Sequence, residues 1–210
     1  MNTLMRCIRK NKRGIVGIEA AIVLIAFVVI AAALAYVVIN MGFYSAQTAK
    51  STIDKGIQEA TSALELDGFV PGLTDTGGNV TYLAIPLKLA VGQEQVDMAS
   101  NTVVVAVQGG NFSLANIYSG AVNATNKDVS DLWNQMTSAP NATSFIYNSQ
   151  VSTVLQQNAK AYMVIYLGTT YGLEAYTKVK VEIRTSRGAA LMIQREIPGG
   201  LPQSKLVDLG

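Results

Sequence analysis

The sequence predicts an α+β protein in which a long N-terminal hydrophobic α-helix is followed by an all-β sandwich domain. Two observations lead to this prediction. Residues 15–43 are mostly apolar and contain no proline, whereas the chain beyond residue 68 alternates short β-like runs with turns rich in Gly, Pro and Asn. The chain therefore divides into a leader at 1–14, a helix at 15–67 and an outer domain at 68–210.

The apolar run is long enough to cross a lipid bilayer as a helix. Residues 20–39 comprise twelve Ile, Val, Leu or Phe residues, seven Ala and one Tyr. At roughly −0.3 to −0.6 kcal/mol for each large residue, the twelve favour membrane insertion by about 4–7 kcal/mol. All five charges before Ile15 are positive. We therefore expect the N-terminus to stay cytoplasmic and the rest of the chain to face outward.

Residues 1–14 have the character of a processing signal rather than of folded structure. Glu19, the one acid in the apolar segment, follows Gly14 by five residues, and a carboxylate in lipid needs a partner. Either Glu19 is hydrated at the headgroup level, or the chain is cut after Gly14 and Glu19 lies near a new amino terminus, its own or a neighbour's. An ordinary secretory signal cut after the Ala-Leu-Ala at 33–35 is a rival interpretation, although the apolar run continues to Ile39.

From Phe43 the helix is expected to continue and to become amphipathic. Its apolar residues recur on one helical face, at Ala46, Ile53, Ile57, Ala60 and Leu64. Two pairs of opposite charge lie one turn apart, Lys50 with Asp54 and Lys55 with Glu59. Gly68 followed by Pro71 is a credible stop. A continuous helix over 15–66 would be roughly 78 Å long, so its outer half must pack on the chain's own domain or on neighbouring helices.

The outer domain shows several β patterns. The runs 101–107 and 161–167 predict largely buried strands. The run 177–184 alternates apolar and charged residues, which predicts a strand with one face in water, and 191–197 predicts its hairpin partner. The run 80–89 predicts one or two further strands around Pro86. Short helices or loops are expected at 130–136 and 151–158.

Residues 12–68 resemble a known family. KRG followed by IVGIEAAIVLIAFVVIAAALAYVVINMGF resembles the class III signal peptide and N-terminal helix of the type IV pilin superfamily. More narrowly, IVLIAF, LAYVVINMGF and AKSTIDKG resemble archaellins, the flagellins of archaeal motility filaments. The resemblance implies cleavage by a prepilin-type peptidase between Gly14 and Ile15, packing of the helix into a filament core, and an immunoglobulin-like outer sandwich. It also implies an assembly role for Glu19, the fifth mature residue.

The resemblance further implies partners and location. The chain would be a structural subunit of the archaellum, a helical homo-polymer outside the cell whose precursor is inserted in the membrane. It would depend on a membrane platform and an ATPase encoded elsewhere. An adhesive type IV-like pilin and a membrane-tethered extracellular binding module remain as alternatives.

The composition argues against catalysis and against nucleic-acid binding. Histidine is absent, and the single cysteine, Cys7, lies in the leader, so the commonest general base and metal ligands are missing from the mature chain. No Gly-rich phosphate loop or nucleophile elbow is present, and we expect no cofactor or metal. Without the five basic residues of the leader, eleven basic and fourteen acidic residues leave a net charge of −3.

Four Asn-X-Ser/Thr sequons lie in the outer domain, at Asn79, Asn111, Asn123 and Asn141. The structural alternative is a set of loops that are simply rich in Asn and Ser. The outward topology and the archaellin resemblance favour N-glycosylation, with surface glycans that coat the filament exterior.

Overall fold

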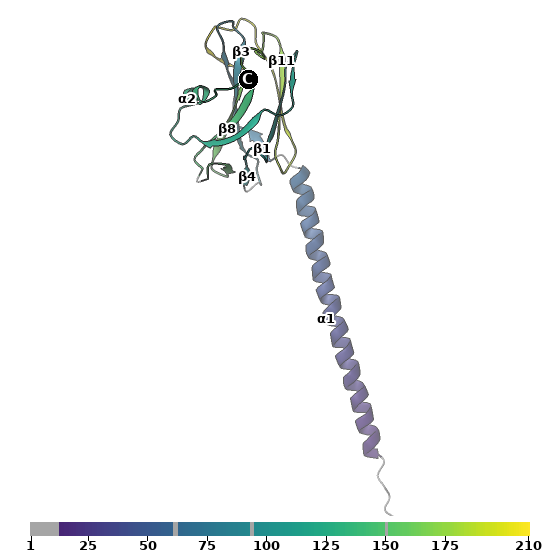
Figure 1. Cartoon of the computed structure of the whole chain (residues 1–210). Coiled ribbons are helices and arrows are strands. Elements are labelled where there is room, and N and C mark those ends of the chain that lie inside the picture. Colours follow the sequence, from purple (N-terminus) through teal and green to yellow (C-terminus); the bar gives the residue numbers. More distant parts are fainter. Residues whose placement is uncertain (1–12, 61–62, 93–94, 150) are drawn as a thin grey trace, which may run out of the picture. The chain divides into compact units, whose positions relative to one another are not determined.

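A computed structural model describes residues 13–60, 63–92, 95–149 and 151–210 (Figure 1). The chain forms two compact units, Met1–Lys55 and Gly56–Gly210. Most of the expected leader therefore lies outside the described residues. Gly14 and Ile15 fall in the first turn of the long helix.

Helix α1, Arg13–Ala60, forms the described part of the first unit and its last residues belong to the second. It has 48 residues and is about 72 Å long at 1.5 Å per residue. The prediction of one long N-terminal helix is confirmed, but its expected extension to residue 66 is wrong. Leu64, which continues the helical spacing in the sequence, lies instead in a strand and is 2% exposed. Burial in the domain core thus outweighs the local helical pattern.

The second unit contains two main sheets and a two-stranded ribbon (Figure 1). The large sheet has the order β13-β2-β3-β10-β8-β7, with β1 also paired to β3. Its strands are β1 Leu64–Leu66, β2 Pro71–Thr74, β3 Val80–Leu89, β7 Tyr118–Asn123, β8 Asn141–Tyr147, β10 Lys160–Tyr166 and β13 Leu206–Asp208. The small sheet has the order β12-β11-β5-β6. Its strands are β5 Val104–Gln108, β6 Ser113–Leu114, β11 Lys178–Arg184 and β12 Leu191–Glu196. All pairs are antiparallel except β7 with β8.

One hydrophobic core joins the two sheets. Ile85 and Ile165 from the large sheet belong to the same buried cluster as Val105, Val181 and Ile183 from the small sheet. The β-sandwich prediction is therefore confirmed. The alternation expected in β11 is confirmed as well, because its apolar residues are buried and β12 pairs with it as the predicted hairpin partner.

The run around Pro86 forms a single strand, β3, although proline is unusual inside a central strand. β1 and β2 pair in succession with the same edge of β3, and β10 pairs with the other edge. The Pro86 carbonyl accepts a hydrogen bond from the Asp67 N–H at 3.0 Å, where β1 ends. The N–H that proline lacks would face the same edge, at the gap between β1 and β2, so few ladder bonds are lost.

Two smaller elements complete the domain. α2, Val129–Asn134, covers the outer face of the large sheet, where Trp133 packs edge-on against Tyr82 with ring centroids 5.4 Å apart. The sequence left helix and loop open near 130–136, and the structure has the helix there. The expectation of helix or loop at 151–158 is wrong, because β9, Val154–Gln156, pairs with β4, Gln95–Asp97. Leu155 of β9 and its register partner Val96 of β4 are both buried in the core cluster, which gives the pair an apolar face.

The strand pairing defines two ends of the domain, which we call proximal and distal. At the proximal end the chain enters through β1, with Leu64 opposite Leu89 at the end of β3. At the distal end β3 begins and β10 ends, with Tyr82 opposite Tyr166. The loops at 75–79, 109–112, 167–177 and 197–205 join strands at the distal end.

Candidate functional site: an uncovered apolar helix and a sequon-bearing domain end

The apolar side chains of α1 are uncovered. The large hydrophobic residues between Ile18 and Ile57 range from 49% exposed at Val37 to 75% exposed at Tyr44. The segment Gly17–Ala60 contains a window of mean hydropathy 3.2 of which none is buried, and it is long and apolar enough to cross a membrane. Such a surface is stable only when lipid or other protein covers it.

The apolar surface goes all the way round the helix axis. The four consecutive residues Ile22, Val23, Leu24 and Ile25 are each at least 54% exposed, and four successive residues span about one full turn. A helix that is hydrophobic on every side needs neighbours on every side, as in a membrane or at the centre of a bundle.

The outer part of α1 is less polar than its sequence suggests. The hydroxyl of Thr48 donates to the Tyr44 carbonyl, and that of Thr52 donates to the Thr48 carbonyl, each at 2.9 Å. These hydroxyls are therefore satisfied within the helix, without a partner chain. The ion pairs expected one turn apart do not form: within the described helix, the nitrogens of Lys50 and Lys55 lie more than 4 Å from any carboxylate oxygen. Exposed pairs of this kind gain little free energy.

Glu19 is exposed on α1 within the apolar surface. Between Gly14 and Lys50 the chain contains no Lys or Arg. The helix beyond Gly14 therefore supplies no positively charged side chain within several turns of this carboxylate.

The sequons divide unequally between the two domain ends. Asn79 lies in the β2–β3 turn, Asn111 in the β5–β6 hairpin loop and Asn141 at the start of β8, all at the distal end. Asn123 ends β7, and its register partner on β8 is Ile146, towards the proximal end. Three of the four sequons thus share the end opposite the chain's entrance into the domain.

The sequons also differ in how free their side chains are. The Asn123 carboxamide accepts from the Thr125 N–H at 2.9 Å and donates to the Ser149 carbonyl at 3.4 Å. The Asn141 carboxamide accepts from the Ser119 hydroxyl at 2.5 Å and donates to the Ser138 hydroxyl at 3.4 Å.

The Asn79 sequon is partly enclosed. Its asparagine is half-buried, and its threonine, Thr81, is 5% exposed with the hydroxyl donating to the Leu73 carbonyl. In the remaining sequon, both Asn111 and Ser113 are exposed. Asn123 and Thr125 are exposed as well, but the Asn123 carboxamide is hydrogen-bonded. Among the described sequons, Asn111 is thus the asparagine that is exposed and whose carboxamide makes no hydrogen bond to the described residues.

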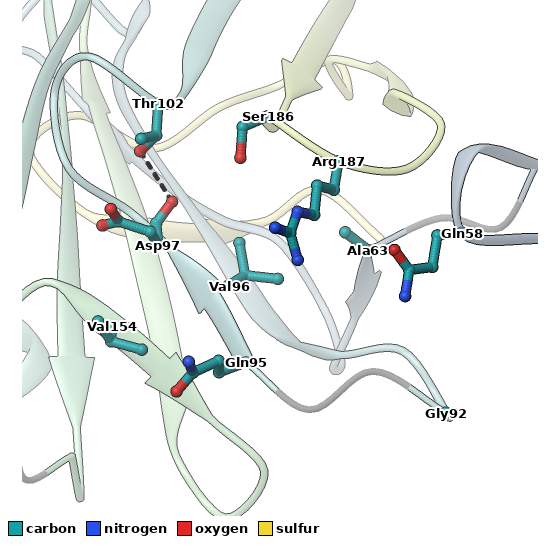
Figure 2. A pocket seen from close by; sticks show the side chains of 10 residues that line it. All are labelled: Gln58, Ala63, Gly92, Gln95, Val96, Asp97, Thr102, Val154, Ser186 and Arg187. Carbon is teal, nitrogen blue, oxygen red and sulfur yellow. Dashed lines mark hydrogen bonds between the residues drawn. The ribbon is translucent and has the colours of Figure 1, made fainter. Parts of the chain in front are cut away.

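The proximal end carries a polar depression between the loops (Figure 2). Its wall includes Asp97, Thr102 and Arg187. The Asp97 carboxylate accepts from the Ala99 N–H at 2.9 Å, and the Thr102 hydroxyl donates to the Asp97 carbonyl at 2.9 Å. These groups therefore stabilise the local turn. In the part of the chain that the structure describes, no cluster of three His, Cys, Asp or Glu residues could hold a metal ion.

A family model for archaeal-type flagellin matches residues 14–195. The chain belongs to the archaeal-type flagellin family. The resemblance noted in the sequence is thereby confirmed.

Flagellins of two archaea are similar to this chain over most of its length. It is 41% identical over 205 residues to probable flagellin 1 of Aeropyrum pernix, with coverage of 96% of this chain and 100% of the relative. It is 31% identical over 197 residues to probable flagellin 1 of Archaeoglobus fulgidus, with coverage of 90% and 92%.

Two solved structures are also similar to this flagellin. The archaeal flagellum of Methanospirillum hungatei strain JF1 matches with a TM-score of 0.57 and 28% identity, over 91% of this chain and 99% of that chain. The crystal structure of archaeal flagellin FlaB1 from Methanocaldococcus jannaschii matches with a TM-score of 0.59 and 18% identity, over 71% and 97%. The second likeness shows the fold alone.

Proposed function

We propose that this flagellin is a structural subunit of an archaeal motility filament and that it polymerises through α1. The observation that carries the proposal is the apolar surface on all sides of α1, whose large hydrophobic side chains are 49% to 75% exposed. The structural likeness to a subunit of the Methanospirillum hungatei flagellum supports a homo-polymer. The filament would lie outside the cell, with the β domain as its outer wall.

The same helix surface suits two successive environments. In the precursor it spans the membrane, and in the filament it packs against the helices of neighbouring copies. Lipid tails are as apolar as Leu, so hydrophobicity alone does not favour the filament over the membrane. Close packing supplies the difference, and α1 has small residues four apart that allow it, Gly17 with Ala21 and Ala31 with Ala35.

A prepilin-type peptidase would cut between Gly14 and Ile15 before assembly. The cut would remove the basic leader that retains the N-terminus in the cytoplasm, and it would create a positively charged amino group at Ile15. Because no Lys or Arg lies between Gly14 and Lys50, this amino group, on the same or a neighbouring copy, is the partner we propose for Glu19. A paired carboxylate is far less costly in an apolar bundle than an unpaired one.

The chain itself would perform no catalytic step. Its role would be to transmit the rotation that a membrane platform and an ATPase generate. N-glycans on the sequons would cover the domain, and Asn111, which is exposed and has no hydrogen bond on its carboxamide among the described residues, would be the preferred acceptor ahead of Asn79, Asn123 and Asn141.

The experiment that tests the proposal is intact-mass and N-terminal peptide mass spectrometry on fibres sheared from cells, combined with swimming assays on a deletion strain. We expect the fibre protein to begin at Ile15 and the deletion strain to stop swimming. An intact Met1 confined to membranes would indicate a tethered module, and a terminus at Tyr36 would indicate an ordinary secreted protein. A deletion strain that swims but no longer attaches to surfaces would indicate an adhesive pilin.

A further inference from the structure

The β10–β11 loop, residues 167–177, lies between two of the sequon loops at the distal end. On one side its Gly172 is beside Asn79, because a Cβ at Gly172 would lie 3.2 Å from the Asn79 Cβ. On the other side its Thr177 contacts Gly110, the neighbour of Asn111, where a Cβ would lie 3.1 Å from the Thr177 methyl carbon. The loop is thus in reach of a substituent on Asn111.

Tyr176, in this loop, is 76% exposed and has a left-handed backbone with φ of 63°. That conformation is a strained one for a bulky aromatic residue. Hydrogen bonds hold it in place: the Tyr176 N–H donates to the Ile197 carbonyl at 2.8 Å, and the Ile197 N–H donates to the Thr177 carbonyl at 2.9 Å.

A glycine lies beneath the Tyr176 side chain. A Cβ at Gly199 would overlap the Tyr176 Oη, so the tyrosine can occupy this position only above a residue without a side chain. The left-handed backbone and the glycine both serve to hold an aromatic ring at the surface, where the domain core gains nothing from it. Strain maintained at an exposed residue points to a role for that residue.

The Asn111 hairpin packs against the β10–β11 loop that carries this ring. The Gly109 N–H donates to the Phe112 carbonyl at 3.0 Å, and the Phe112 ring lies over Gly109. Phe112 also packs edge-on against Tyr171 of the loop, with ring centroids 5.2 Å apart. The hairpin and the loop are therefore joined, and the exposed Asn111 is held on their common surface.

We propose that the N-linked glycan on Asn111 packs against the exposed ring of Tyr176 and orders the β10–β11 loop. The proposal rests on the glycosylation of Asn111 proposed above. A sugar ring presents a C–H face that complements the negative face of an aromatic ring, while the tyrosine hydroxyl remains able to hydrogen-bond. The glycan would thus be part of the folded distal surface rather than a free chain in solvent.

The test is backbone hydrogen exchange of peptides covering 167–177 in intact sheared filaments, with glycopeptide mass spectrometry at Asn111 in the same sample. The contact is tested with four proteins, wild type, Ser113→Ala, Tyr176→Ala and the double variant, and a fifth serves as the control. Ser113→Ala removes the sequon and keeps the asparagine. Thr125→Ala, which removes the proximal sequon at Asn123, is the matched control. The amides of Tyr176 and Thr177, both hydrogen-bonded in the fold, report on the loop.

We expect Asn111 to be glycosylated and Ser113→Ala to speed exchange in the loop several-fold, with no change in Thr125→Ala. In the Tyr176→Ala background, Ser113→Ala should have no further effect. An equal acceleration in both backgrounds would overturn packing on Tyr176. The proposal would also be overturned if Asn111 is glycosylated and Ser113→Ala does not speed exchange in the loop. An unmodified Asn111 in wild-type filaments would overturn it as well, but that result would not affect the proposal that the chain forms filaments. If Tyr176→Ala lowers filament yield while Ser113→Ala leaves the exchange unchanged, a second copy rather than the glycan covers the ring.

Discussion

A charge in the middle of the apolar run tests the role of α1 most severely. We predict that Ile30→Asp abolishes filaments. Ile30 is 57% exposed in the single chain. Lipid covers this side chain in the precursor and neighbouring helices cover it in the filament, so losing it removes close packing rather than a transfer from water. The larger effect is the carboxylate, which in lipid is relieved by snorkelling and local thinning of the bilayer but in a closed bundle stays uncompensated.

An uncompensated buried charge of this kind costs about 3–5 kcal/mol, which corresponds to an association weaker by about a hundredfold to a few thousandfold. Insertion of the precursor should survive. An aspartate at the helix centre costs about 2.5–3.5 kcal/mol, while the eleven remaining large residues of the run favour insertion by about 3–7 kcal/mol. The variant should therefore accumulate in the membrane without forming fibres.

The assay is quantitative immunoblotting of the membrane and sheared-fibre fractions, with electron microscopy of the cells. Ile30→Leu is the control, because it keeps the residue apolar at nearly the same volume, and it should assemble normally. Wild-type fibre yield from Ile30→Asp would refute the reasoning that α1 is buried among its neighbours.

Three further predictions concern the outer domain of the purified chain in detergent. Ile165→Ala should lower the free energy of unfolding by about 2–5 kcal/mol in urea titrations, because Ile165 is fully buried; a loss below about 0.5 kcal/mol would contradict the shared core. The hydrogen bond from Lys160 lowers the pKa of Asp67 below its usual value of 3.8. The stabilisation is therefore present above that value and lost as the pH falls through the folded-state pKa. The free energy of unfolding of Asp67→Asn should accordingly fall less than that of wild type between about pH 5 and pH 2. If the two proteins lose the same free energy over this range, the ion pair of Asp67 with Lys160 does not contribute to stability. Gly168→Ala should lower the melting temperature, since Gly168 has φ of 70° and a Cβ there would lie 2.7 Å from the Ala139 Cβ. The left-handed backbone alone costs about 1–2 kcal/mol, so an unchanged melting temperature would exclude this geometry.

The sequence predicts those parts of the fold that depend on composition and on short-range patterns. The apolar run of α1 predicts a helix irrespective of context, and the alternation in β11 predicts its buried face. The end of α1 could not be predicted, because Leu64 fits both a helical spacing and a strand. Its 2% exposure and its pairing with Leu89 show that long-range burial decides the outcome.

The candidate sites also include features that are visible in the sequence and features that only the fold creates. The sequons are local motifs, so Asn111 is visible in the sequence, but its accessibility depends on the hairpin that presents it. The contact between Tyr176 and Gly199 could not be inferred, because the two residues are 23 positions apart in the sequence and only the fold brings them together. The parallel pairing of β7 with β8 likewise has no short-range signal.

The central claim is that α1 is buried among other copies in the filament, and a single thiol tests it most directly. The only native cysteine, Cys7, lies in the leader, so Val37→Cys in a Cys7→Ser background gives one reporter at a helix position that is 49% exposed in the single chain. Maleimide labelling is measured on sheared fibres and on the same fibres dissociated in detergent, with Val91→Cys, at a domain position that is 99% exposed, as the accessible control. Our account predicts that the thiol of the Val37→Cys variant is labelled at least tenfold more slowly in fibres than after dissociation, while the control is labelled readily in both. Equal labelling of the helix thiol in the two states would contradict it.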